Sequence, residues 1–177
     1  MAIFRKDLPM LRVLFVFLLF FHTLFGGDTQ NFSFIGLSAS TQTINTDPGN
    51  IKHEAGFALS YGQQSLDWRT TFNLDYTLHS YYGASVEIDK ILLDDMFGTP
   101  KLRPYLGGVT GYLKYDKDEL SVAADDTNGF YFGGNFGFII YATDNIDADI
   151  GYHYYKIQNL DFLDDLHGAT IAIHYFF

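Results

Sequence analysis

The final stretch of the chain, residues 167–177, reads HGATIAIHYFF and alternates with a period of two. After His167, one parity is entirely apolar, whereas the other mixes small, polar and aromatic residues. The apolar parity comprises Ala169, Ile171, Ile173, Tyr175 and Phe177. Because successive side chains of a β-strand point to opposite faces, this pattern predicts a strand with one apolar face that ends on an aromatic residue. A fold made of such strands must find an environment for that face.

The same alternation recurs along the chain between turn-forming segments. It is clearest around residues 66–78, where Trp68 and Leu74 share one parity and Arg69 and Asn73 share the other. Tight turns are expected at residues 64–65 and 142–145, and longer connections at residues 42–53, 93–101, 114–128 and 156–166. We therefore predict an all-β chain, an antiparallel up-and-down barrel of about eight strands. The expected strands are residues 34–41, 54–63, 66–78, 81–92, 102–113, 129–141, 146–155 and 167–177.

Alternation alone does not say which face of a barrel is apolar. A soluble barrel of the lipocalin kind would turn its apolar residues inward, and a transmembrane barrel would turn them outward. The chain holds 18 Phe, 13 Tyr and 17 Gly, which suits aromatic girdles outside and little space inside. These aromatic residues near strand ends, the terminal Phe177 and the N-terminal segment favour the transmembrane barrel.

The N-terminal segment has the organisation of a secretory signal. Arg5, Lys6 and Arg12 precede and enter an apolar run over residues 11–21, and Gly26 and Gly27 are small residues at a plausible cleavage point. A membrane-spanning helix is the alternative, but residues 13–25 are short for the roughly 20 apolar residues that a span needs. We expect residues 1–26 to be a cleavable signal peptide and residues 27–177 to form the barrel domain.

Charge and cysteine content exclude several classes of function. The formal net charge of −10 makes nucleic acid an improbable partner, because phosphate binding needs clustered Lys and Arg. The absence of cysteine from the sequence excludes disulfides and thiolate metal sites. We expect no cofactor.

Two segments in the second half of the chain carry a family resemblance. They read RPYLGGVTGYL at residues 103–113 and GFYFGGNFGFIIYATDNIDADIGYHYY at residues 129–155, and the last strand then ends on Phe177. With that ending, the chain resembles the OmpA-like or opacity-type small outer-membrane β-barrels of Gram-negative bacteria. The resemblance implies a cell outer-membrane location, with outer-membrane lipid, lipopolysaccharide and the barrel assembly machinery as partners. It also implies that Ile173, Tyr175 and Phe177 form the signal that this machinery recognises.

The family's members differ in function, so the resemblance leaves the role open. We expect a non-enzymatic barrel with a mostly filled polar lumen and a structural or surface-interaction (adhesin-like) role, toward an extracellular ligand that the sequence does not identify. One alternative is a narrow pore or carrier for small solutes of the OmpW type. A lipid-modifying enzyme is the other, with His153 beside Asp147 and Asp149 on one parity and Ser60 or Ser85 as a nucleophile. A polar lumen lining explains these residues more simply.

Six charged residues share the inward parity near one end of the predicted barrel. We expect them to form an ionic cluster that interrupts the lumen, because charges in so narrow a space persist only if they are paired or hydrated. The cluster comprises Arg69, Glu87, Asp89, Arg103, Asp147 and Asp149.

Two possible metal sites have weaker support. Five acids between Asp116 and Asp126 lack the pattern of an EF-hand and are expected to form a solvated loop. His167 and His174 flank the final strand with no partner at ligand spacing. No metal site is therefore expected.

Overall fold

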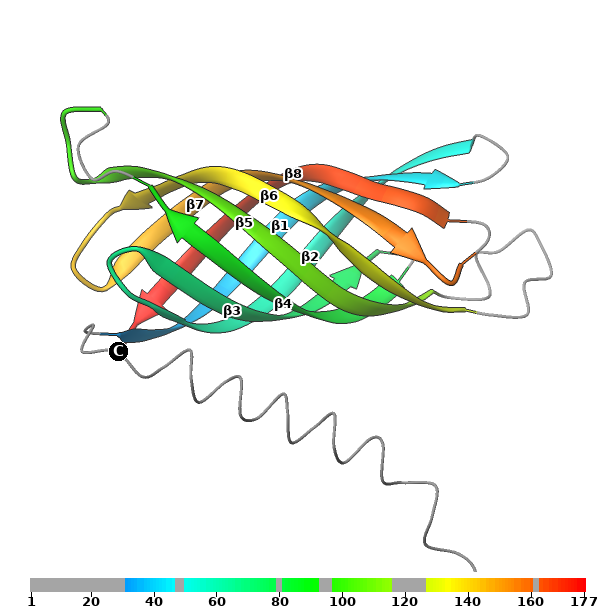
Figure 1. Ribbon diagram of the computed structural model, residues 1–177, viewed down its shortest axis with the longest axis horizontal. Helices are drawn as coiled ribbons and strands as arrows, with labels where there is room; N and C mark the ends of the chain where they lie inside the picture. Colours follow the sequence, from blue (N-terminus) through cyan, green and yellow to red (C-terminus); the bar gives the residue numbers. More distant parts are fainter. Residues whose placement is uncertain (1–30, 47–49, 79–80, 93–96, 116–126, 161–162) are drawn as a thin grey trace, which may run out of the picture. The chain divides into compact units, whose positions relative to one another are not determined.

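The computed structural model describes residues 31–46, 50–78, 81–92, 97–115, 127–160 and 163–177, which form a closed antiparallel barrel of eight strands (Figure 1). Each strand pairs with the next along the chain, and β1 closes the barrel against β8. This confirms the predicted fold class. The strands are β1 (Phe32–Thr46), β2 (Asn50–Gln64), β3 (Trp68–Thr77), β4 (Tyr81–Ile91), β5 (Leu102–Tyr115), β6 (Asn128–Tyr141), β7 (Ile146–Gln158) and β8 (Leu163–Phe176).

Residues 1–30 lie outside the described part of the chain, so the signal peptide and its cleavage after Gly26 stay predictions. Among the described residues, no helix has the length and apolar character needed to cross a membrane. We call the barrel end that carries the connections β1–β2, β3–β4, β5–β6 and β7–β8 the outer end. The inner end carries the other three connections and the start of β1 and end of β8.

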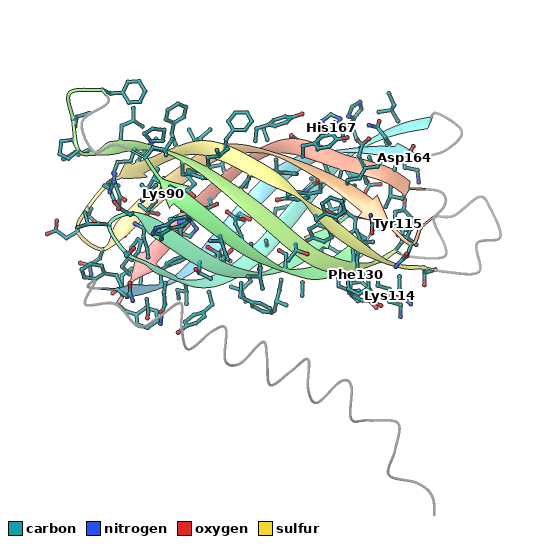
Figure 2. All side chains as sticks on the ribbon, viewed as in Figure 1. Lys90, Lys114, Tyr115, Phe130, Asp164 and His167 are labelled. Atoms are coloured by element: carbon teal, nitrogen blue, oxygen red, sulfur yellow. The ribbon has the colours of Figure 1, made fainter. Side chains whose placement is uncertain are left out.

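The outside of the barrel is a belt of large apolar side chains. Leu37, Leu74 and Ile171 are 68%, 50% and 60% exposed, whereas Arg69 on the opposite parity is 2% exposed. Charged side chains on the outside gather near the barrel ends, with Lys90 toward the inner end and Lys114 toward the outer end (Figure 2). A soluble barrel would bury the apolar parity, so this arrangement is that of a membrane-spanning barrel.

Strands at the outer end are longer than predicted. The expected loop over residues 42–53 is wrong, because β1 and β2 continue as a ladder to the pair Thr46 and Asn50. The expected loop over residues 156–166 is also wrong, since β7 runs to Gln158 and β8 begins at Leu163. The reason is that the inward parity continues past the predicted ends, with Ile44 fully buried inside the barrel.

The barrel interior is layered along its axis. At the outer end an apolar layer fills the lumen, and a smaller apolar group, Ile91, Tyr105 and Ile139 with Tyr141 against it, lies near the inner end. Polar and charged side chains occupy the region between them, and this region is the candidate site. The outer apolar layer comprises Ile44, Tyr81, Val109, Leu113, Tyr115, Tyr131, Ile157, Leu160, Leu163 and Leu166.

The two faces of β3 are expected to respond differently to a new charge. Leu74 points outward midway along its strand, so Leu74→Arg should lower the free energy of unfolding by about 2–4 kcal/mol, the cost of Arg near the bilayer midplane. The neighbouring Asn73 faces the lumen and the polar cavity, where a cation can find water and Asp75. Asn73→Arg should therefore cost less. Urea titrations of the two variants refolded in lipid vesicles measure the difference, and equal costs would contradict a lipid-facing Leu74.

Candidate functional site in the barrel lumen

Arg69 is the centre of the buried ionic group. Its Nε lies 2.9 Å from Asp89 Oδ2, its Nη1 lies 2.6 Å from Asp149 Oδ2, and its Nη2 lies 3.9 Å from Glu87 Oε1. Asp89 is the direct cross-strand partner of Arg69 on β4, whereas Asp149 reaches it from β7. The Tyr105 ring lies beneath the guanidinium, with its centroid 4.9 Å from Cζ. One cation thus holds carboxylates from two sides of the barrel together.

Asn135 completes this group from β6. Its side-chain amide donates to Glu87 Oε1 at 2.6 Å and to Asp89 Oδ1 at 3.0 Å, so it separates two carboxylates that would otherwise repel each other. Gly107 on β5 leaves the space that these groups occupy, because a Cβ there would collide with Asp89 and press on Asn135 Oδ1. Asn135 was not among the predicted site residues, although its position on the inward parity of β6 was a usable signal.

Asp147 and His174 form a second buried pair at the same level. They are cross-strand partners on β7 and β8, and His174 Nδ1 lies 2.8 Å from Asp147 Oδ1. The imidazole packs against Phe34 with ring centroids 4.7 Å apart and ring planes tilted by 59°, and it covers Gly36, where a Cβ would collide with it. The expectation that His174 has no partner at ligand spacing is wrong, because strand pairing supplies the partner from a segment distant in sequence.

The six residues predicted as one cluster divide into three groups. Arg69, Glu87, Asp89 and Asp149 are together, and Asp147 is paired with His174 beside them. Arg103 does not join the acids: its Nη1 donates to the Leu66 carbonyl at 2.7 Å and its Nε to the Leu92 carbonyl at 3.3 Å. These carbonyls belong to the inner connections, where strand pairing has ended, and a buried guanidinium is a ready donor for them. The shared parity of these six residues determined which face of the sheet they occupy, but not which groups they contact.

A second polar layer lies on the outer-end side of the ionic group. It contains the residues that were candidates for a Ser-His-Asp hydrolase. His153 Nε2 lies 3.1 Å from Gln42 Oε1 and its Nδ1 lies 3.1 Å from Thr170 Oγ1. Ser60 donates to Asn73 at 2.5 Å, and Ser85 donates to Asp75 at 3.3 Å. Neither serine is bonded to His153, and the hydrogen bonds of the imidazole go to Gln42 and Thr170. These side chains therefore form a network of polar lumen residues rather than a Ser-His-Asp triad.

A polar cavity of about 90 Å³ lies between these groups. It is lined by Arg69, Glu87 and Asp149 from the ionic group and by His153 and His174, among others. That volume has room for several water molecules. The cavity is too small for a sizeable solute.

The predicted assembly signal lies apart from the lumen, on the outside of the barrel. Ile173, Tyr175 and Phe177 all point outward and are 59%, 51% and 66% exposed, and the Phe177 amide donates to the Ser33 carbonyl at 3.0 Å. The acidic segment 116–126 lies outside the described residues. The role of the terminal aromatics in assembly stays a prediction.

Comparison with solved structures shows which known barrels share this fold. Neisserial surface protein A (NspA) has a solved structure that matches with a TM-score of 0.62 and 16% identity, over 82% of this chain and 97% of that one. Outer membrane protein H (OprH) of P. aeruginosa matches with a TM-score of 0.58 and 16% identity, over 82% and 99%. Ail, the attachment invasion locus protein of Yersinia pestis, matches with a TM-score of 0.52 and 16% identity, over 84% of this chain and 99% of that one.

The protein thus has the fold of the small eight-stranded outer-membrane barrels, and the resemblance predicted from the sequence is confirmed at the level of the fold. No protein-family model matches the chain, and no curated protein sequence matches it. The apolar exterior and the shared fold agree with the predicted outer-membrane location. Function has to be argued from the lumen and the surface of this chain, since fold alone does not assign it.

Proposed function

We propose that this protein is a non-conducting outer-membrane barrel with a structural or surface-interaction role. The observation that carries the proposal is the filled lumen, with an apolar layer at the outer end and a buried ionic group centred on Arg69 below it. A pore needs a continuous hydrated path. The described part of the barrel instead has a polar cavity of about 90 Å³ around the ionic group and a separate cavity of about 330 Å³ at the inner end, lined by Gln64, Arg103 and Tyr141 among others. At eight strands, the interior of a barrel is just wide enough for side chains to fill it.

The proposal excludes an enzymatic role for the lumen. A hydrolase would need a nucleophile hydrogen-bonded to a base, and the described candidates Ser60, Ser85 and His153 are bonded to other groups. The lumen side chains instead form bonds that connect strands across the barrel. Arg69 links β3 to β4 and β7, and Gln64 of β2 donates to the Tyr141 hydroxyl of β6. Such cross-links stiffen the barrel, which suits a scaffold for surface segments.

Ail offers a comparison for the surface role, because one solved structure of that protein is a complex with the heparin analogue sucrose octasulfate. A polyanion suits this chain poorly, because the formal net charge of the chain is −10. Several of its acids lie in the segment 116–126. We therefore propose that a surface partner, where one binds, is neutral or cationic. Like-charge repulsion would otherwise oppose the encounter.

Planar-bilayer recording tests the filled lumen. The protein refolded from residues 27–177 should produce no conductance steps above the bare bilayer, because no ion can pass both interior layers without removing buried side chains from their contacts. Heat-dependent gel mobility of the same sample verifies that the barrel is folded, and a known porin under the same conditions serves as the positive control. Reproducible steps from the folded protein would contradict the proposal and favour the narrow pore.

A further inference from the structure

Three potential metal ligands meet inside the barrel at the level of Arg69. One ligand atom each from Asp147, Asp149 and His174 lies within 4.8 Å of the others, and all three residues are buried. They come from two adjacent strands, Asp147 and Asp149 two positions apart on β7 and His174 opposite Asp147 on β8.

Two carboxylate oxygens of this group are buried without a partner. Asp147 Oδ2 and Asp149 Oδ1 accept no hydrogen bond from the residues that the structure describes. The other oxygens are occupied, Asp147 Oδ1 beside His174 and Asp149 Oδ2 on Arg69. A buried carboxylate oxygen without a donor or a cation is costly. Both oxygens are thus available to a ligand that carries positive charge.

The charges in this half of the lumen do not balance. Glu87, Asp89, Asp147 and Asp149 share this half of the lumen with the guanidinium groups of Arg69 and Arg103, which leaves two excess negative charges when the acids are ionised. Arg103 contributes little to the balance, because it bonds backbone carbonyls at the inner connections. One divalent cation would offset the excess.

We propose that Asp147, Asp149 and His174 bind a divalent first-row transition metal ion inside the barrel. Two carboxylate oxygens and an imidazole nitrogen suit Zn²⁺ and Mn²⁺, whereas Ca²⁺ and Mg²⁺ prefer ligand sets made of oxygen alone. The surrounding residues hold the ligands in place. Arg69 fixes Asp149 through Oδ2, and Phe34 and Gly36 fix the plane of His174. The ion would join β7 to β8 next to the closing seam of the barrel.

Metal analysis of the refolded protein tests this site. The protein is prepared without a polyhistidine tag and with His53, His79 and His167 replaced by Asn, so that His153 and His174 are the only histidines in residues 27–177. After treatment with EDTA, it is dialysed against Zn²⁺ and the bound metal is measured by mass spectrometry. We expect about one Zn²⁺ per barrel, and at least a tenfold loss of affinity in Asp147→Asn and in His174→Gln, given that even outer-shell changes cost 10–100-fold.

Matched controls come from the polar layer above. His153→Gln and Asp75→Asn each change one lumen residue of the same type outside the ligand group, and both should retain the Zn²⁺; His153 is buried and Asp75 is half-buried. Heat-dependent gel mobility verifies the fold of every variant. If a ligand variant does not fold, pulsed EPR of Cu²⁺ bound to the parent protein, with and without His153→Gln, should still detect a coupled imidazole nitrogen. Folded parent protein that binds no Zn²⁺, ligand variants that bind it unchanged, or Cu²⁺ without nitrogen coupling would each overturn the site.

Discussion

Removal of residues 163–177 is expected to abolish the folded barrel in the outer membrane. These residues include all of β8, which hydrogen-bonds to β1 on one side and to β7 on the other. Without it, two strand edges would face lipid with unpaired backbone groups, each costing several kcal/mol. Cell fractionation followed by gels of unheated and heated samples should find no heat-modifiable species. Accumulation of a folded truncated barrel would contradict the closed topology.

Phe177→Ala distinguishes closure of the barrel from the proposed recognition of its last strand by the assembly machinery. The substitution keeps the backbone bond from residue 177 to the Ser33 carbonyl, so the purified variant should still refold in detergent. In cells we expect severe loss of the assembled protein, because the outward aromatic that the assembly machinery is proposed to read is gone. Phe136→Ala is the matched control, since it removes another outward aromatic of similar exposure, 57% against 66%, from mid-barrel. Equal amounts of the two variants in the outer membrane would refute a special role for Phe177.

Periodicity predicted the fold because a barrel is specified mainly by which parity faces outward. The sides assigned to Leu74, Asn73 and Arg69 from alternation are the sides that they occupy. Alternation has no information about where a strand ends once it leaves the lipid. A turn is indicated by Asp47, Pro48 and Gly49, but the expected loop around them took in residues of both neighbouring strands. Gln42 and Ile44 lie in that expected loop and keep the inward parity of β1. The ladder beyond the expected end is stabilised by the apolar layer at the outer end, a tertiary effect.

The candidate site was less predictable because it depends on register. Parity placed six charged residues inside, but the partner of each one depends on how strands far apart in sequence are shifted along the axis. Asp147 meets His174 because of the β7–β8 register, and Asn135 reaches Glu87 and Asp89 across β5. Arg103 shows the opposite case, since backbone carbonyls at the inner connections compete with the acids for its donors. No local sequence signal predicts the contacts of Asp147 and Asn135 or those of Arg103.

Arg69→Ala is expected to be the most destabilising single substitution in the lumen. It removes the cation that bonds Asp89 and Asp149 and leaves buried carboxylates without compensation, for which the expected loss is about 3–5 kcal/mol. Urea unfolding in lipid vesicles, after treatment with EDTA so that no metal ion substitutes for the lost charge, measures this loss. Lys90→Ala is the control, because it removes an exposed pair with Asp67 outside the barrel and should cost at most about 1 kcal/mol.

Neutralising the partners of Arg69 distinguishes its charge from its volume. When Arg69→Ala is combined with Asp89→Asn and Asp149→Asn, the buried negative charge is removed along with the cation, so much of the lost stability should return. A triple variant as unstable as Arg69→Ala would mean that the lost packing, including the contact with the Tyr105 ring, dominates the cost.

Bilayer recording of the same variants separates stability from conduction. If the outer apolar layer also closes the lumen, Arg69→Ala should stay non-conducting as long as it is folded, whereas conductance in that variant alone would make the ionic group the barrier to ions.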